Sequence, residues 1–256
     1  MTEQVYFEQP LSERIRTFLR LELLFEQIQH HLKGTTDWDA RATLATLNDI
    51  WSAFGRADLK TEILKELERQ TATLARMESN PGVDRKRLGE ILDRLDLLTD
   101  RLFSQAGQPM AIFKKHDLLS ALRQRSTIPG GTCTFDLPGF HLWMQQPTEQ
   151  RTEQMRGWLG HVNTIELAIA MVLQLTRGSS TPTREVAGDG TFQRNLDPTM
   201  PCQLIRVAIP ADAPYFAEIS GGKHRFSVRF MEQPDFAERA FQTSDDVPFE
   251  LTTCVL

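Results

Sequence analysis

Apolar residues recur every three or four positions through most of the first half of the chain. This spacing places them along one face of an α-helix, where they can be buried together. The first such series comprises Phe18, Leu21, Phe25, Ile28 and Leu32. A helix with one apolar face must bury it against another element, so a succession of these helices predicts an α-helical bundle.

Further series of the same kind follow, separated by turn signals. We expect helices at about 38–54 and 58–77, then a turn at the Asn-Pro-Gly of residues 80–82. Asp84 is a good N-cap for the next helix, whose apolar stripe extends through Leu102. A shorter helix is expected around 117–125, before the sequence "IPGG".

The pattern changes at Pro129. The stretch "GTCTFDLPGFHLWM" at 131–144 has short β-prone runs and predicts a hairpin, and 148–177 predicts one long helix. The polar segment 177–190 is expected to be a loop. The later strand candidates are "TFQRNL", "CQLIRVAIP", "YFAEIS", "HRFSVRFM" and "VPFELTTCVL".

These patterns together predict an α+β fold. We expect an N-terminal α-helical bundle domain at 9–127 and a β-rich domain at 128–256. The second domain would contain an antiparallel sheet covered by the one long helix. The N-terminal segment 4–8 is strand-like and is expected to join that sheet.

Composition excludes several classes of protein. A net charge of -5 over 256 residues argues against a general nucleic-acid binder. Because no run approaches 18 consecutive apolar residues and no signal peptide is visible at the start, we expect a cytoplasmic protein without membrane insertion. The 3 cysteines are far apart and predict reduced thiols. We expect no cofactor and no metal site.

Few residues suggest catalysis. No nucleophile elbow, phosphate-binding loop or zinc-protease motif occurs in the sequence. Asp136 and His141 could form a catalytic pair of a hydrolase, and this alternative stays open. The structural interpretation is favoured, in which Asp136 shapes its turn and His141 lies in a strand, because the pair lacks a nucleophile.

The sequence "GGKHRFSVRF" at 221–230 carries basic side chains at alternate positions. In a strand successive side chains point to opposite faces. One face would then be apolar, with Phe226, Val228 and Phe230. The other would be basic, with Lys223, Arg225, Ser227 and Arg229. The basic face is either a solvated surface paired with acids on a neighbouring strand, or a docking face for an extended peptide or an anion.

Three long motifs resemble the ZapD family of bacterial division proteins. They are "FEQPLSERIRTFLRLE" at 7–22, "RQRSTIPGGTCTFDLPGFHLW" at 123–143 and "SGGKHRFSVRFM" at 220–231. The resemblance implies a non-enzymatic cytoplasmic protein of the mid-cell division ring. It implies binding to the C-terminal tail of FtsZ, the tubulin-like division GTPase, bundling of FtsZ filaments, and a homodimer with a helical and a β-rich domain.

The resemblance also favours the docking interpretation of the basic strand. Tails of this kind are short peptides that are both acidic and apolar, so the expected tail-binding residues are Arg225, Arg229 and Lys223. Arg56, after Gly55 at a helix junction, is a further candidate. One tail site per chain in a symmetric dimer would allow the protein to hold two filaments.

Overall fold

The computed structural model describes residues 3–54, 58–104 and 111–256. The chain forms two compact units, one made of Phe18–Val172 and the other of Met1–Thr17 together with Leu173–Leu256. The first is helical and the second contains the strands, so the predicted α+β class is confirmed. The predicted domains divided the chain at 127 and 128, whereas 128–172 belongs to the helical unit. The division into domains at 9–127 and 128–256 stays a prediction.

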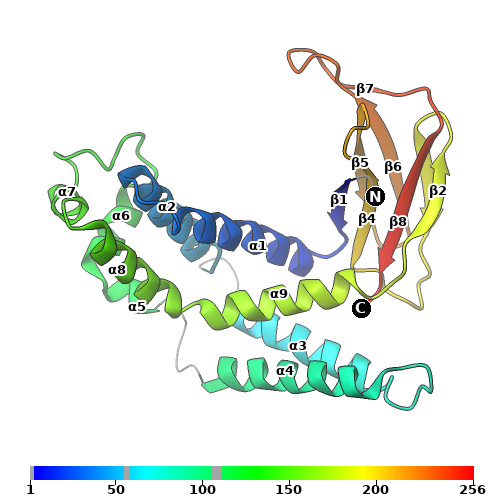
Figure 1. The fold of residues 1–256 in the computed structure, drawn as a ribbon, viewed down its shortest axis with the longest axis horizontal. Coiled ribbons are helices and arrows are strands. Elements are labelled where there is room, and N and C mark those ends of the chain that lie inside the picture. Colours follow the sequence, from blue (N-terminus) through cyan, green and yellow to red (C-terminus); the bar gives the residue numbers. More distant parts are fainter. Residues whose placement is uncertain (1–2, 55–57, 105–110) are drawn as a thin grey trace. The chain divides into compact units, whose positions relative to one another are not determined.

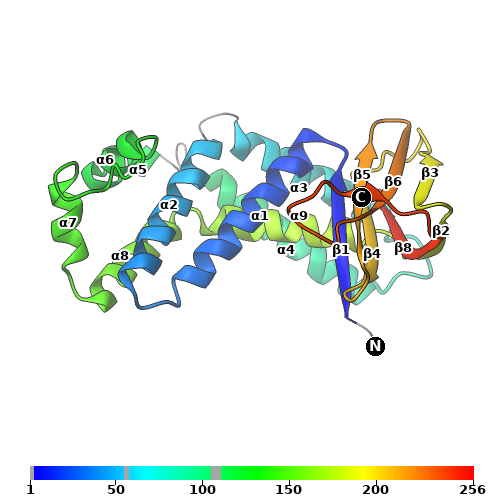
Figure 2. The same ribbon diagram turned by 90° about the horizontal axis from the view of Figure 1, so that it is seen from above.

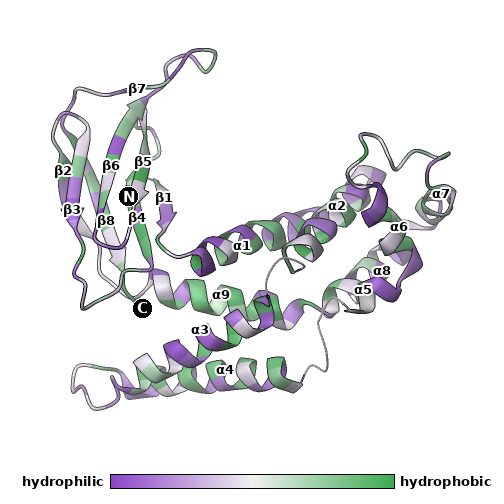
Figure 3. Ribbon diagram, turned by 180° about the vertical axis from the view of Figure 1, so that it is seen from behind, coloured by the Kyte–Doolittle hydropathy of each residue, from purple (hydrophilic) through white to green (hydrophobic). Residues whose placement is uncertain are grey.

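Helices account for most of the described part of the helical unit (Figure 1). Figure 3 shows hydrophobic and hydrophilic residues alternating along them, as expected for amphipathic helices. The helices of the chain are α1 (Glu13–His31), α2 (Asp37–Phe54), α3 (Leu59–Ala75), α4 (Arg85–Ser104), α5 (Ala111–Lys115), α6 (Asp117–Arg125), α7 (Pro138–Met144), α8 (Thr148–Gly160) and α9 (Asn163–Arg177).

Two aspartates cap the paired helices α3 and α4. Asp84 accepts hydrogen bonds from the backbone N–H groups of Lys86 and Arg87, at 3.0 and 3.1 Å, which confirms it as the N-cap of α4. Asp58 accepts from the N–H of Thr61 at 3.4 Å before α3. Each cap satisfies backbone donors that the first turn of a helix leaves without an intrahelical partner.

A buried arginine joins three parts of the helical unit. Arg151 on α8 is only 4% exposed. Its Nη1 donates to Asp37 Oδ1 at 2.6 Å and to the carbonyl of Met144 at 2.7 Å. A buried guanidinium needs such charged and polar partners to offset its lost hydration. The start of α2 and the end of α7 are thereby held against α8.

Two predictions for the middle of the chain were wrong. Residues 131–144 form turns and then α7 instead of a hairpin. Pro138 occupies the first turn of α7, where proline is favoured, and Phe140, Trp143 and Met144 are buried at helical spacing. The long helix expected at 148–177 is divided into α8 and α9, which meet at 63°.

The division between α8 and α9 has a local cause. Gly160 is a poor helix former, and the break that follows it places Val162 completely out of contact with solvent. Within the described residues, no single helix is long and apolar enough to cross a membrane, although α8 and α9 would pass that test as a bent pair.

The second unit is built from two antiparallel sheets. The first has the strand order β1-β4-β8-β2 and the second has the order β3-β6-β5, with β7 paired to β6. Pairing of Phe7 with Val207 shows that the N-terminal strand joins the first sheet, as predicted. The strands are β1 (Gln4–Pro10), β2 (Thr183–Ala187), β3 (Thr191–Asn195), β4 (Leu204–Pro210), β5 (Tyr215–Gly221), β6 (Arg225–Glu232), β7 (Phe241–Gln242) and β8 (Val247–Cys254).

The inner faces of the two sheets share one hydrophobic core. In Figure 2 the two sheets form separate layers, with β3, β5 and β6 on one side and β2, β4 and β8 on the other. Phe230 on β6 lies 5.2 Å from Phe249 on β8, measured between ring centroids. One antiparallel sheet covered by the long helix was expected. Instead there are two sheets, and their inner faces pack against each other.

The segment 177–190 is not the loop that was expected. It contains β2, and the two-residue turn at Asp189 and Gly190 leads directly into β3. Both turn residues have positive φ, 48° and 67°. Such a turn favours an Asp-Gly pair between two strands, which is the signal that the sequence carries here.

Glu8 on β1 is the centre of an ion-pair network on the first sheet. It accepts hydrogen bonds from Arg177 at 2.8 and 2.9 Å and from Arg206 at 2.7 Å. Burial alone would raise the pKa of this carboxyl, but the hydrogen bonds and charges of the two arginines lower it below its ordinary value of 4.5.

We expect truncation of the shared core to be costly. Phe230→Ala should lower the free energy of unfolding by about 3–5 kcal/mol, because Phe230 is completely buried. Phe241→Ala is the matched control: Phe241 is 52% exposed, so the loss should stay within about 0.5 kcal/mol. Urea unfolding measures both. Equal stability of Phe230→Ala and the wild type would contradict the shared core.

Glu8 should make stability dependent on acid. Because its pKa is lower in the folded chain, ionised Glu8 stabilises the fold fully above the unfolded-state pKa. This contribution is lost as pH falls through the folded-state pKa. At neutral pH, Glu8→Gln should therefore lower the free energy of unfolding by roughly 1.5–3 kcal/mol. The gap from the wild type should close as pH falls below 4.5.

Urea unfolding between neutral and acidic pH measures this gap. Glu13→Gln provides the control, because Glu13 has an 85% exposed side chain in a surface pair with Arg16. A gap between Glu8→Gln and the wild type that stays constant with pH would rule out the proposed linkage.

Candidate functional site

The basic strand is β6, in the middle of the second sheet. Phe226, Val228 and Phe230 are buried in the shared core, whereas Arg225 and Arg229 are exposed. The predicted alternation is therefore confirmed within the strand. At about 3.3 Å per residue, the α-carbons of Arg225 and Arg229 lie roughly 13 Å apart.

The other two candidates do not lie in this strand. Lys223 was expected to share the face of Arg225, but β6 begins at Arg225, and Lys223 lies in the exposed turn after β5. Gly221 and Gly222 explain the turn, because glycine suits a reversal of the chain better than a strand interior. Lys223 is close to the start of β6 along the chain. Arg56 lies outside the described residues.

The two arginines of β6 differ in their partners. Arg229 Nη2 donates to Glu218 Oε2 at 2.8 Å, and the two residues are direct cross-strand partners. Their side chains are 55% and 46% exposed, so water screens the pair and it contributes at most about 1 kcal/mol. Arg225 and Lys223 form no side-chain hydrogen bond or ion pair with any residue in the described part of the chain.

Apolar and uncharged side chains also lie beside these cations and Glu218 on the outer face. Phe216 on β5 pairs with Met231 on β6, and both side chains are partly exposed. Gln193 on β3 pairs with Ser227, between the two arginines. The surface thus offers guanidinium donors for carboxylates and two apolar side chains beside them, which suits an extended peptide of mixed character.

In the described structure Asp136 pairs with an arginine and not with His141. Asp136 Oδ1 accepts a hydrogen bond from Arg125 Nη1 at 3.1 Å, which ties the turn before α7 to the end of α6. His141 lies exposed on α7, where a strand had been expected. No hydrogen bond joins the two side chains in the described structure. The structural role that was expected for Asp136 is consistent with this geometry.

Two of the cysteines are poor nucleophiles at neutral pH. Burial raises the pKa of Cys202 to about 11 and that of Cys254 to about 12, so both thiols stay protonated. Cys133 is exposed. Across residues 3–54, 58–104 and 111–256, no group of three or more histidine, cysteine or acidic side chains is arranged to hold a metal ion.

Sequence comparisons agree with the resemblance of the three motifs. The sequence model of the ZapD family, described as a cell division protein, matches residues 19–229. The chain is 43% identical over 256 residues to the cell division protein ZapD of Methylococcus capsulatus, covering 100% of both chains.

Two further relatives carry the same name. The identity is 37% to ZapD of Aromatoleum aromaticum, with 98% of both chains covered. It is 35% to ZapD of Dechloromonas aromatica, with 98% of this chain and 100% of the relative covered. Matches of this extent show that the chain belongs to the ZapD family of cell division proteins.

Proposed function

We propose that this protein binds the C-terminal tail of FtsZ, cross-links its filaments and stabilises the division ring at mid-cell in the cytoplasm. It acts as an adaptor and not as an enzyme. Family membership supports a role in division. The observation that carries the tail-binding proposal is the free, exposed Arg225 on a strand whose opposite face is fixed in the core.

The chemistry of the outer face suits an acidic and apolar tail. A guanidinium can bind a carboxylate with two parallel hydrogen bonds, and Arg225 and Lys223 have no competing partner within the described residues. Arg229 must exchange Glu218 for a carboxylate of the tail, which costs little because the existing pair is exposed. Phe216 and Met231 supply the neighbouring apolar surface.

Cross-linking follows from repetition of this site. A dimer would present two tail sites, and a filament presents a tail on every subunit. The second binding event then takes place at a high effective concentration, so each contact can be weak while the bundle is stable. The helical unit provides long amphipathic helices through which two copies of the chain could associate.

Charge reversal on β6 should weaken tail binding. Removing one charge-assisted contact costs roughly 1.5–3 kcal/mol, which is about ten- to a hundredfold in affinity. Arg225→Glu and Arg229→Glu should exceed this loss because they also repel an acidic peptide. Titration with a fluorescent FtsZ tail peptide measures affinity, and co-sedimentation with FtsZ filaments measures bundling. Both signals should decrease as salt screens the charges.

Two further variants make this test specific. Arg184→Glu makes the same charge change at an exposed position of β2, in the other sheet, and should bind as the wild type does. Glu218→Gln removes the intramolecular competitor of Arg229 and should strengthen binding by up to about fivefold. If Arg225→Glu and Arg229→Glu melt normally and bind with wild-type affinity, the receptor lies elsewhere.

A dimer is the second requirement of the proposal. Sedimentation equilibrium at micromolar concentration should give twice the chain mass of 29.2 kDa, because a cross-linker with one tail site per chain needs two copies. A monomer at every concentration that supports bundling would exclude this mechanism of cross-linking.

A further inference from the structure

The second sheet has an open edge close to the proposed tail-binding residues. Its strand order is β3-β6-β5, with β7 paired to the end of β6, so β3 is an edge strand. In Figure 2, β3 lies at the outer end of the layer that it forms with β5 and β6. Gln193 and Asn195 of β3 are exposed. The free edge of a sheet is a template on which another chain can add a strand.

The register shows which backbone groups point toward this edge. Leu196 donates its backbone N–H to the carbonyl of His224 at 2.8 Å, in phase with the pairing of β3 and β6. In an antiparallel pair, positions bonded to the partner alternate with positions whose N–H and C=O point away from it. Counting back from Leu196, Gln193 and Asn195 point away from β6. Within the described residues, the only pairing on this side of β3 is a single bridge in the turn before it, so both residues offer their N–H and C=O to an added strand.

The outer face of β3 leaves room for the arginines of β6 to reach this edge. Asn195 is the direct cross-strand partner of Arg225, and Thr191 is the partner of Arg229. Both partners are short and uncharged, so an extended arginine can lie over its partner toward the edge. Neighbouring strands lie about 4.8 Å apart, so a strand added to β3 would lie about 10 Å from β6. An arginine and a long acidic side chain on the same face can together span this distance.

The opposite edge of the sheet is less suitable for an acidic peptide. β5 places Glu218 directly beside Arg229 on the outer face, so a strand added to β5 would bring its carboxylates next to this acid. The charged side chain of β3, Arg194, shares the inner face with Phe192 and is paired with Glu185 at 2.7 Å. The outer-face residues of β3 are all uncharged: Thr191, Gln193 and Asn195.

We propose that the FtsZ tail binds as an additional β-strand on the free edge of β3. This mode of binding rests on the proposed function, and it adds the backbone of Gln193 and Asn195 to the receptor. Main-chain hydrogen bonds to the edge hold an extended peptide, and the nearby guanidinium groups select one whose outer-face side chains are acidic. Acidic residues four positions apart in the tail would then lie level with Arg225 and Arg229.

Substitution of Gln193 tests the edge directly. Gln193→Pro removes the N–H that points outward, and proline at such an edge position leaves the hydrogen bonds to β6 intact. Affinity for the FtsZ tail peptide should fall about fivefold, as expected for one lost hydrogen bond. Gln193→Ala is the matched control, because it keeps the N–H, and it should bind as the wild type does. Thermal melting shows whether both variants are folded.

Backbone methylation of the tail peptide gives a second test, which needs no change to the protein. In an added strand every second N–H of the peptide points to β3. Peptides that carry an N-methyl group at one position at a time should therefore lose affinity at alternate residues, by about fivefold or more, and keep it at the residues between. This test decides the question if Gln193→Pro fails to fold.

Hydrogen exchange locates the added strand on the protein. With free tail peptide at ten times its dissociation constant, exchange of the amide protons of Gln193 and Asn195 should slow by up to about tenfold, because only the unbound fraction exchanges. The amide protons of β2, which is an edge strand of the first sheet, should exchange at an unchanged rate.

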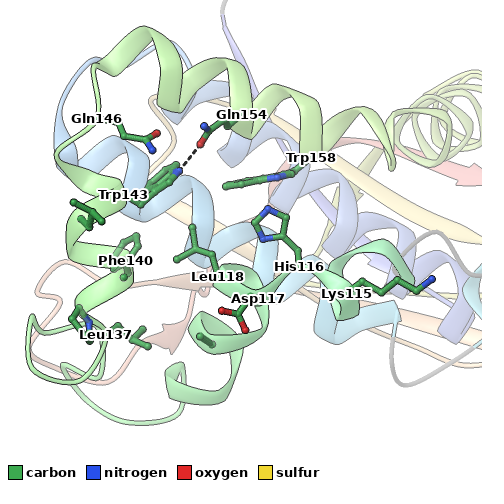
Figure 4. Close-up of a pocket in the computed structure, with 14 residues that line it drawn as sticks. Lys115, His116, Asp117, Leu118, Leu137, Phe140, Trp143, Gln146, Gln154 and Trp158 are labelled. Carbon is green, nitrogen blue, oxygen red and sulfur yellow. Dashed lines mark hydrogen bonds between the residues drawn. The ribbon is translucent and has the colours of Figure 1, made fainter.

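A pocket in the helical unit supplies an independent reference. Its volume is about 840 Å³, and Figure 4 shows Trp143, Trp158, Phe140 and Leu118 in its lining. None of the proposed tail-binding residues lines this pocket. The indole N–H signals of the two tryptophans, followed by NMR, should therefore stay unchanged as the tail peptide is added.

The outcomes separate strand addition from tail binding itself. Strand addition is wrong if folded Gln193→Pro binds as Gln193→Ala does and methylation shows no alternation, while Arg225→Glu still weakens binding; the tail would then dock on the outer face alone. Shifts of Trp143 or Trp158 without slower exchange at Gln193 and Asn195 would also overturn it, because the tail would lie in the helical unit. No binding of the tail peptide to the wild type would overturn the proposed function as well.

Discussion

The alternation of side chains along β6 determines how the proposed tail site is presented. Phe226, Val228 and Phe230 are held between the two sheets, and pairing of β6 with β3 and β5 fixes the register. A slip by one residue would place the arginines in the core and the aromatic rings in water. The hydrophobic core therefore keeps Arg225 and Arg229 on the outer face, where Arg229 pairs with Glu218.

Local patterns in the sequence predicted the elements whose causes are local. The helical stripes, the cap at Asp84 and the strand β6 depend on residues close together along the chain, and the structure contains all of them. The Asp-Gly turn at residues 189 and 190 was equally local, but the polar composition around it favoured a loop. For 131–144, β-propensity favours a hairpin, whereas Pro138 and the helical spacing of the buried residues agree with α7.

Features that depend on residues far apart along the chain could not be predicted from local sequence patterns. Which acid faces Arg229 depends on the register between β5 and β6, and 11 positions separate Arg229 from Glu218 along the sequence. Likewise, the packing of the second sheet on the first depends on core residues from strands far apart along the chain.

The local charge of the site differs in sign from that of the whole chain. Arg229 pairs with Glu218, whereas Arg225 and Lys223 form no ion pair within the described residues, so two positive charges remain uncompensated at the proposed tail site. The chain as a whole carries -5. At physiological ionic strength charges interact strongly only within a Debye length of about 8 Å, so a bound peptide responds to the nearby cations more than to the distant excess of acids. An acidic protein can therefore attract an acidic tail at this face, and the same screening keeps each contact weak enough to depend on repetition along a filament.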